Sequence, residues 1–378
     1  MATLSYFNTC FFDFGAVARL SKAMASLGIE HPLLVTDKGV RQAGLADIVL
    51  EKTGDPGRVE IFDGTPANPT ERAVLDAARQ CRESDCDGII ALGGGSAIDL
   101  AKATALMACS DEPLLHYAGL ARGKVKQVLP LIAVPTTAGT GSEVSVGMII
   151  IVEDGRKLTF VADQFIPAIA ICDPELTAGM PAGLTAATGM DAVTHCIEAV
   201  LSPVVNPPAE AIGLDGLERA IAGGALEVAV ANGSDRQARW HMMMASTEGA
   251  YAFVKGLGAV HAMSHACGAL PGLQLHHGTL NAVLLPTILR FNAGAADEKM
   301  QRIARAMGLG SGGEIADFIS GLNQRVGLPA SLAAMGVIEG HIDGLAEAAA
   351  ADMASQTNPR PVESSDYVSL FSEALDIS

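Results

Sequence analysis

Histidines gather in one short stretch of the chain. Four of the nine lie between residues 261 and 277, namely His261, His265, His276 and His277. His261 and His265 are four residues apart, which would place them on one face of a helix. Imidazoles among Ala, Met, Leu, Gly and Val need polar partners, and one divalent cation can bind several of them. A cluster of hydrogen-bonded core histidines is the alternative interpretation.

A second pair has the same spacing. Asp191 and His195 also lie four residues apart in a stretch with a helical pattern. An Asp–His pair alone is more often a hydrogen-bonded core pair. It indicates a metal site only in combination with the histidine-rich stretch. One carboxylate with three imidazoles suits Fe²⁺ or Zn²⁺, whereas Ca²⁺ prefers oxygen ligands alone.

Glycines follow an apolar segment at Gly93, Gly94 and Gly95, and Ser96 comes next. Glycines let the backbone approach a ligand closely, and Ser96 could cap the helix expected to follow. The free N–H groups and the positive dipole end of such a helix favour a pyrophosphate. The sequence lacks the GxGxxG pattern, so a tight strand-to-helix turn without a ligand is an equal alternative.

A second loop, residues 136–142, carries four hydroxyls and two glycines after another apolar segment. Its side chains suit ribose and phosphate oxygens, and two such loops at the ends of parallel strands would form a nucleotide site. Asp37 ends an earlier strand-like segment. Its carboxylate could accept from a ribose 2′-hydroxyl and would repel a 2′-phosphate, which favours NAD over NADP. A helix cap or a surface aspartate is the alternative for Asp37.

The elements that must carry these loops alternate along the first half of the chain. Strands are expected at 32–36, 88–92 and 130–134, with helices at 69–84 and about 96–109. Alternating strands and helices predict a parallel sheet covered on both faces.

The second half has a helical pattern without a convincing strand. Pro181 and Gly183 mark the change, which predicts an α/β domain over 1–181 and a helical domain over 182–378. Helices are expected at 184–202, 209–232, 235–255, 259–270, 300–308, 313–326 and 341–355.

Composition limits the function classes. Hydrophobic residues make up 49% of the 378 residues, and the formal charge of −17 disfavours nucleic-acid or membrane-surface binding. Seven scattered cysteines without a CxxC pair favour neither a disulfide framework nor a thiolate zinc site. Since neither a secretory signal nor an apolar run of membrane-spanning length is recognisable, a cytoplasmic protein is expected.

Taken together, these segments resemble the iron-containing (group III) alcohol dehydrogenases, in the family's order and through most of the chain. The matching stretches are residues 93–99, 135–143, 173–176, 189–198, 258–265, 277–286 and 357–359. The resemblance implies a Rossmann-like N-terminal domain, a helical C-terminal domain as in dehydroquinate synthase, and an active site between them. It also implies a homodimer that interconverts a small primary alcohol and its aldehyde.

Site residues follow from the resemblance by position. It implies a divalent metal, Fe²⁺ or Zn²⁺, on Asp191, His195, His261 and His277, with His265 beside the metal as a proton relay. His276 stays an alternative ligand because the stretch before it is longer than the family's usual spacing. The residues implied for NAD binding are Asp37, Gly93, Gly94, Gly95, Ser96, Asp99, Thr136, Thr137 and Thr140.

Within the family the chain is most similar to 4-hydroxybutyrate dehydrogenases, through residues 14–17, 206–208 and 275–280. Lys255 could then bind the carboxylate of a four-carbon hydroxy acid, or could be a lysine on a helix surface. Two rival functions are a metal-independent reductase similar to maleylacetate reductase and a non-catalytic nucleotide- or metal-binding protein. Glycerol-dehydrogenase-like and dehydroquinate-synthase-like activities are more distant, because those relatives carry different metal motifs.

Overall fold

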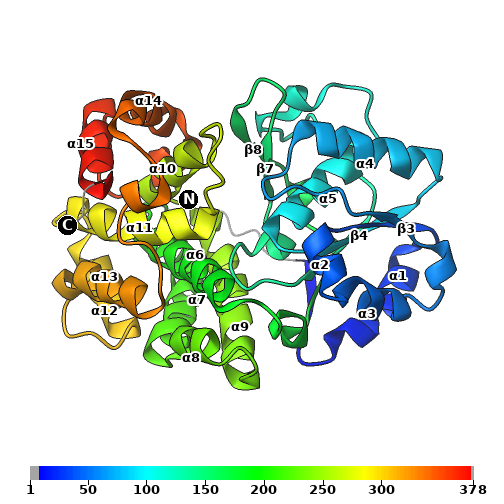
Figure 1. Cartoon of the computed structure of the whole chain (residues 1–378), viewed down its shortest axis with the longest axis horizontal. Coiled ribbons are helices and arrows are strands. Elements are labelled where there is room, and N and C mark those ends of the chain that lie inside the picture. The colour runs from blue at the N-terminus through cyan, green and yellow to red at the C-terminus, as the bar shows by residue number, and fades with distance from the viewer. Residues whose placement is uncertain (1–7, 376–378) are drawn as a thin grey trace. The chain divides into compact units, whose positions relative to one another are not determined.

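The computed structural model describes residues 8–375, which form two compact units. One comprises residues 8–137 and 141–179, and the other comprises 138–140 and the chain from 180 onward. The first unit is built on a six-stranded parallel sheet of order β1-β9-β6-β4-β2-β3 (Figure 1). Its strands are β1 (Thr9–Phe12), β2 (Pro32–Val35), β3 (Glu60–Phe62), β4 (Gly88–Gly93), β6 (Leu131–Pro135) and β9 (Ile169–Cys172).

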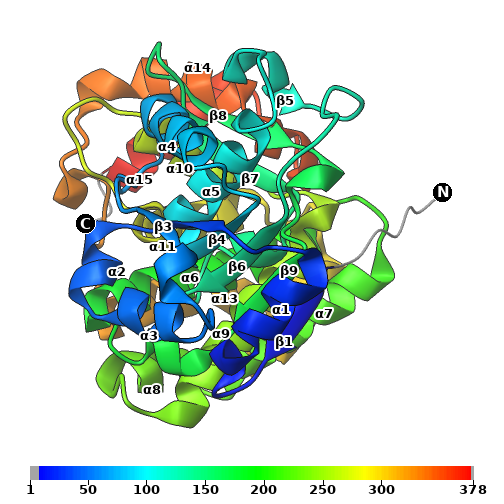
Figure 2. The ribbon, with the colours of Figure 1, turned by 90° about the vertical axis from the view of Figure 1, so that its right-hand side faces the viewer.

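Alternate residues of the central strands enter two separate cores. Leu33, Ile89 and Ala133 pack with helices α4 (Glu71–Glu83) and α5 (Gly95–Met107). The next residue of each strand packs on the opposite face, with α1 (Leu20–Leu27) and α3 (Leu45–Glu51). Figure 2 shows these helix pairs on opposite faces of the sheet. Burial on both faces explains why the strands read as continuous apolar runs.

Three of the six strands were predicted from the sequence; β1, β3 and β9 were not. The prediction also missed a small second sheet of β5 (Gly119–Leu120), β8 (Lys157–Val161) and β7 (Gly147–Ile151), in that order. These strands hold two to five residues, too few for a clear alternation of apolar and polar positions. The expected parallel sheet covered on both faces is confirmed.

The second unit is helical, as predicted (Figure 1). Its helices are α6 (Ala182–Leu201), α7 (Pro207–Leu217), α8 (Ala225–Ala231), α9 (Arg236–Ala252), α10 (Ala259–Gly268), α11 (His277–Phe291), α12 (Asp297–Ala306), α13 (Ile315–Arg325), α14 (Ile342–Ala351) and α15 (Ser364–Leu375). The segment expected as one helix over 209–232 is divided at Gly223 and Gly224, where Gly224 adopts a positive φ of 70°. None of the helices described is long and apolar enough to cross a membrane.

Two helices of the second unit, α11 and α15, were missed, as were α1, α2 (Lys38–Gln42) and α3 of the first unit. In α11, Pro286 has no N–H to donate to the carbonyl of Ala282, four residues earlier. The side chain of Asn323 on α13 supplies the missing donor, with Nδ2 2.7 Å from that carbonyl oxygen. A tertiary contact therefore offsets the proline, and no local pattern could have revealed it.

Candidate metal centre

Helix α6 presents a carboxylate and an imidazole on one face. Asp191 and His195 are both buried, and His195 Nε2 lies 3.8 Å from Asp191 Oδ1. Helix α6 is buried inside the helical unit from Thr185 to Leu201, and this burial excludes water from the face that carries Asp191 and His195. Burial lowers the pKa of His195 to about 4, which keeps its imidazole neutral and able to bind a cation.

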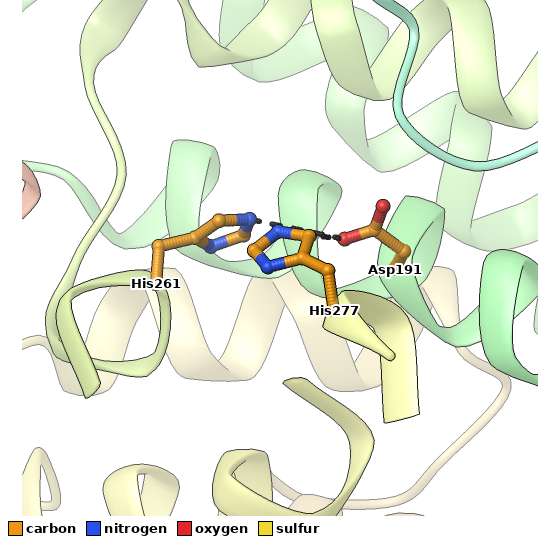
Figure 3. A group of neighbouring side chains, drawn as sticks. All are labelled: Asp191, His261 and His277. Atoms are coloured by element: carbon orange, nitrogen blue, oxygen red, sulfur yellow. Dashed lines mark ion pairs between the residues drawn. The ribbon is translucent and has the colours of Figure 1, made fainter. Parts of the chain in front are cut away.

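Helices α10 and α11 bring two more imidazoles to the same carboxylate. His261 Nε2 lies 3.9 Å and His277 Nε2 3.7 Å from Asp191 Oδ1. Figure 3 shows both rings pointing toward the Asp191 carboxylate. The ligand atoms of Asp191, His261 and His277 all lie within 4.8 Å of one another. A four-coordinate ion with bonds of about 2.1 Å separates its ligands by roughly 3.4 Å, so small side-chain shifts suffice to bind one.

The far nitrogen of each imidazole fixes its tautomer. His195 Nδ1 lies 3.3 Å from the carbonyl oxygen of Gly139, which can only accept. His261 Nδ1 lies 2.5 Å from Glu198 Oε2, and His277 Nδ1 lies 2.9 Å from the hydroxyl of Ser264. That hydroxyl donates its own hydrogen to the His277 carbonyl at 3.4 Å, so it accepts from Nδ1. With Nδ1 donating in each case, Nε2 carries a lone pair toward Asp191. This is the arrangement that metal-binding histidines require, so the donor set fits a divalent cation.

Glu198 also sets the charge around His261. Burial alone would lower the pKa of His261, but the carboxylates of Glu198 and Asp191 raise it above its ordinary value. The other oxygen of Glu198 accepts from the backbone N–H of Val260 at 2.8 Å. One carboxylate therefore holds both the start of α10 and the ring that α10 carries.

A glycine lets α11 approach α6 closely. A Cβ added at Gly278 would lie 2.2 Å from the carbonyl oxygen of Ala187 and 3.2 Å from Asp191 Cβ. Any larger residue would push the first turn of α11, which carries His277, away from Asp191.

Of the two candidates for the fourth ligand, the structure brings His277 to Asp191. His276 is the N-cap residue of α11 and is exposed. The irregular segment 269–276 joins α10 to α11.

His265 lies beside this group with a partner of its own. Its ring stacks on that of His277 with centroids 5.4 Å apart, and its Nδ1 lies 2.9 Å from Asp352 Oδ2. Burial alone would raise the pKa of Asp352, but the hydrogen bond from His265 lowers it below its ordinary value. His265 Nε2 is buried and has no hydrogen-bond partner among the described residues.

Lys255 is neither exposed nor unpaired. Its side chain is 0% exposed, and its Nζ lies 2.7 Å from Glu210 Oε1. Burial lowers its pKa to about 8. The interpretation as a helix-surface lysine is therefore wrong. Binding of a substrate carboxylate stays a prediction, and it would require the ammonium group to exchange Glu210 for the substrate.

The glycine loop at the end of β4 has a backbone that only glycine tolerates well. Gly93 has a φ of 150°, and a Cβ there would lie 2.7 Å from Ala97 Cβ and 3.5 Å from Asp37 Oδ2. A Cβ at Gly94 would lie 3.2 Å from Thr137 Oγ1. The two predicted loops therefore meet, and Thr136 N donates to the Gly93 carbonyl at 3.0 Å.

Three residues assigned to the cofactor also have structural roles. Asp37 caps α2 (Lys38–Gln42) through Oδ1, which accepts from Val40 N at 2.9 Å, so the cap interpretation is correct. The expected Ser96 cap is wrong, since α5 begins after Gly94 and the Ser96 hydroxyl donates to the Ala67 carbonyl at 2.6 Å.

Asp99 is buried and braces the second loop. One of its oxygens accepts from the Ser142 hydroxyl and the other from Ile149 N at 2.9 Å. Burial raises its pKa above the ordinary value. Asp99 therefore holds the loop in place, and both oxygens would have to leave these partners to contact a cofactor directly.

Glu198, Ser264, Asn281 and Asp352 were missed as site residues from sequence. Glu198 carried a usable signal, because it lies seven residues after Asp191 and three after His195 on the same helix. The others come from separate elements, so only the fold brings them together.

Comparisons with known proteins agree with this geometry. The family model described as "Iron-containing alcohol dehydrogenase" matches residues 8–174, and "Fe-containing alcohol dehydrogenase family, C-terminal" matches 185–375. A 4-hydroxybutyrate dehydrogenase of Cupriavidus necator is 49% identical over 99% of this chain and 100% of that protein. A 1,3-propanediol dehydrogenase of Klebsiella pneumoniae is 37% identical over 97% of both.

Solved structures share the fold over nearly the whole chain. A 1,3-propanediol oxidoreductase superposes with a TM-score of 0.93 at 36% identity, covering 99% of this chain and 100% of that one. A sulfoacetaldehyde reductase from Bifidobacterium kashiwanohense in complex with NAD⁺ gives 0.89 at 28% identity, with 100% of both chains covered. The non-catalytic alternative is thereby set aside. The chain belongs to the iron-containing alcohol dehydrogenase family and is an oxidoreductase that interconverts alcohols and aldehydes with NAD.

Proposed function

We propose that the chain interconverts 4-hydroxybutyrate and succinic semialdehyde. The observation that carries this substrate is the 49% identity to a 4-hydroxybutyrate dehydrogenase along its full length, against 34–37% for relatives named for neutral alcohols such as 1,3-propanediol and methanol. In the oxidative direction the carbinol carbon gives a hydride to NAD⁺ and the hydroxyl gives up a proton. The homodimer and the cytoplasmic location expected from the sequence stay predictions.

We infer that Asp191, His195, His261 and His277 hold the metal. Iron is the family's namesake, and Zn²⁺ suits the same donors. When bound, a divalent cation supplies Lewis acidity to the substrate oxygen. The side chains contribute a preset geometry, because Glu198, Ser264 and the Gly139 carbonyl fix the orientation of the three rings.

His265 is the proposed acceptor of the hydroxyl proton. Its Nδ1–H donates to Asp352, which leaves the lone pair on Nε2. Because Nε2 is buried without a partner among the described residues, a substrate hydroxyl can be its partner. In the reductive direction the same nitrogen returns a proton to the oxygen.

The glycine loop and Asp37 are proposed to bind NAD. Because Asp37 Oδ2 faces Gly93, a 2′-phosphate at this position would meet a negative charge. Asp37→Ser keeps a residue that can cap α2 and removes that charge. We expect kcat/KM with NADP to rise about tenfold or more relative to that with NAD.

Asp55→Ser is the matched control for Asp37→Ser. Asp55 also caps a helix, accepting from Gly57 N at 3.2 Å, although it is exposed whereas Asp37 is half-buried. It should leave the ratio of NADP to NAD efficiency unchanged. An unchanged ratio in Asp37→Ser as well would remove Asp37 from the cofactor site.

Substrate and metal are tested together by NAD reduction with 4-hydroxybutyrate, 1-butanol and 1,3-propanediol, with and without a tight chelator. Chelator-sensitive activity that is highest with 4-hydroxybutyrate is expected. Chelator-sensitive activity that is highest with a neutral alcohol would keep the family and reject the hydroxy acid. Activity that changes neither with the chelator nor with added Fe²⁺ or Zn²⁺ would favour the metal-independent reductase.

A further inference from the structure

Asn281 lies in the middle of the proposed ligand set. It is on α11, one turn after His277, and is fully buried. Its Nδ2 lies 2.7 Å from Asp191 Oδ1, 3.2 Å from His261 Nε2 and 3.2 Å from His277 Nε2. One amide nitrogen thus contacts the ligand atoms of three residues, the same atoms that would bind an ion.

The chemistry of these atoms makes Asn281 the donor. Asp191 presents a carboxylate oxygen, and in the neutral imidazoles the two Nε2 atoms carry lone pairs because their rings donate through Nδ1. An amide oxygen in this place would face three acceptors and be repelled, whereas an amide NH₂ offers two hydrogens. Asn281 Oδ1 has no hydrogen-bond partner among the described residues, so the side chain is oriented by its NH₂ group alone.

We propose that Asn281 stands in for the metal when no ion is bound. Its NH₂ group lies within hydrogen-bond distance of three acceptors, of which those of Asp191 and His261 are buried and that of His277 is partly buried, and holds them in the arrangement that an ion needs. A lone pair on Nε2 cannot accept a hydrogen bond and bind a cation at once, so ion binding releases Asn281 from both imidazoles. Asn281 therefore stabilises the ion-free protein more than the loaded one. This inference rests on the proposed metal site.

The consequence runs against the usual expectation for a residue that contacts metal ligands. Removing its donors leaves buried acceptors unpaired mainly in the ion-free protein. By thermodynamic linkage, a change that destabilises the ion-free state more than the loaded state tightens ion binding. Asn281→Leu should therefore bind Co²⁺ about tenfold more tightly than the wild type.

The experiment compares the wild type, Asn281→Leu and Asn323→Leu, each stripped with a chelator. Tm is measured with and without Co²⁺, and the Kd for Co²⁺ is measured by competition with a chelating dye. Asn323 is the matched control: it is a buried asparagine that also has an unpartnered Oδ1 and also contacts α11, but through the Ala282 carbonyl. We expect Asn281→Leu to lower the ion-free Tm more than the loaded Tm, and Asn323→Leu to lower both equally.

Equal losses of Tm in both states for Asn281→Leu, or an unchanged or weaker Kd, would overturn the proposal. Should Asn281→Leu fail to fold, Asn281→Ala removes the same donors without added bulk, and the same outcomes decide. A wild-type protein whose Tm does not respond to Co²⁺, Zn²⁺ or Fe²⁺ would instead overturn the metal site itself. The two failures are therefore distinguishable.

Discussion

His261→Ala is expected to abolish alcohol oxidation and to strip the protein of most of its metal. The substitution removes one of the four proposed ligands and also leaves the buried Glu198 carboxylate without its imidazole partner. Because Lewis-acid stabilisation of the reacting oxygen is worth several kcal/mol, kcat/KM should fall by at least roughly 10³-fold. Metal content after dialysis, measured by mass spectrometry, should fall with it.

His241→Ala is the control for His261→Ala. His241 belongs to the same helical unit, but its Nδ1 lies 3.4 Å from Arg219 rather than against Asp191. It should keep the wild-type metal content and activity. Full activity of His261→Ala with normal metal content would show that the ion lies elsewhere, and the ligand assignment would then fail.

His265→Asn is expected to lower kcat by roughly 10²- to 10⁴-fold, the usual contribution of general acid–base catalysis. Unlike His261→Ala, it should keep its metal, because Nδ1 of His265 is bound to Asp352 and His265 is not one of the four proposed ligands. Measuring kcat and metal content on the same sample separates the two roles. A wild-type kcat would mean that the proton leaves by another route.

Asp352→Asn refines that result. Asparagine can still cap the short helix over Met353–Thr357, where Asp352 Oδ1 accepts from Ala354 N at 2.8 Å. It removes only the charge that fixes the His265 tautomer. We expect a smaller loss of kcat than in His265→Asn with little change in KM, whereas an unfolded or metal-free protein would indicate a structural role.

The sheet was predictable where strands are buried on both faces, because β2, β4 and β6 read as unbroken apolar runs. Strands β1 and β3 are short and only partly buried, which weakens their pattern, whereas β9 is a four-residue run buried as fully as β2 and its omission has no structural reason. Helix α11 was not predicted, because a proline inside a helical pattern normally ends the helix. Asn323, which offsets that proline, lies 41 residues away.

The residues proposed as ligands could be proposed from sequence because of their spacing. Asp191 and His195 are four residues apart, and so are His261 and His265. A helical pattern therefore places each pair on one face of its helix. Asp352 lies 87 residues from His265, and Asn281 lies 90 residues from Asp191, so no spacing rule connects either pair. Lys255 shows the converse error, because its ammonium group, expected to be available to a substrate, is buried and already paired with the partly buried Glu210 on α7.

The way the ligands are divided among elements governs which parts of the chain can change length during evolution. Asp191, His195 and Glu198 share one face of α6, so inserting a single residue among them would rotate the later ones by about 100° and separate the group. The segment 269–276 carries no helix or strand and joins α10 to α11 from outside the ligand set. Insertions there can diversify the enzyme while the proposed metal site is inherited intact, which makes this connection the natural place for loop exchange.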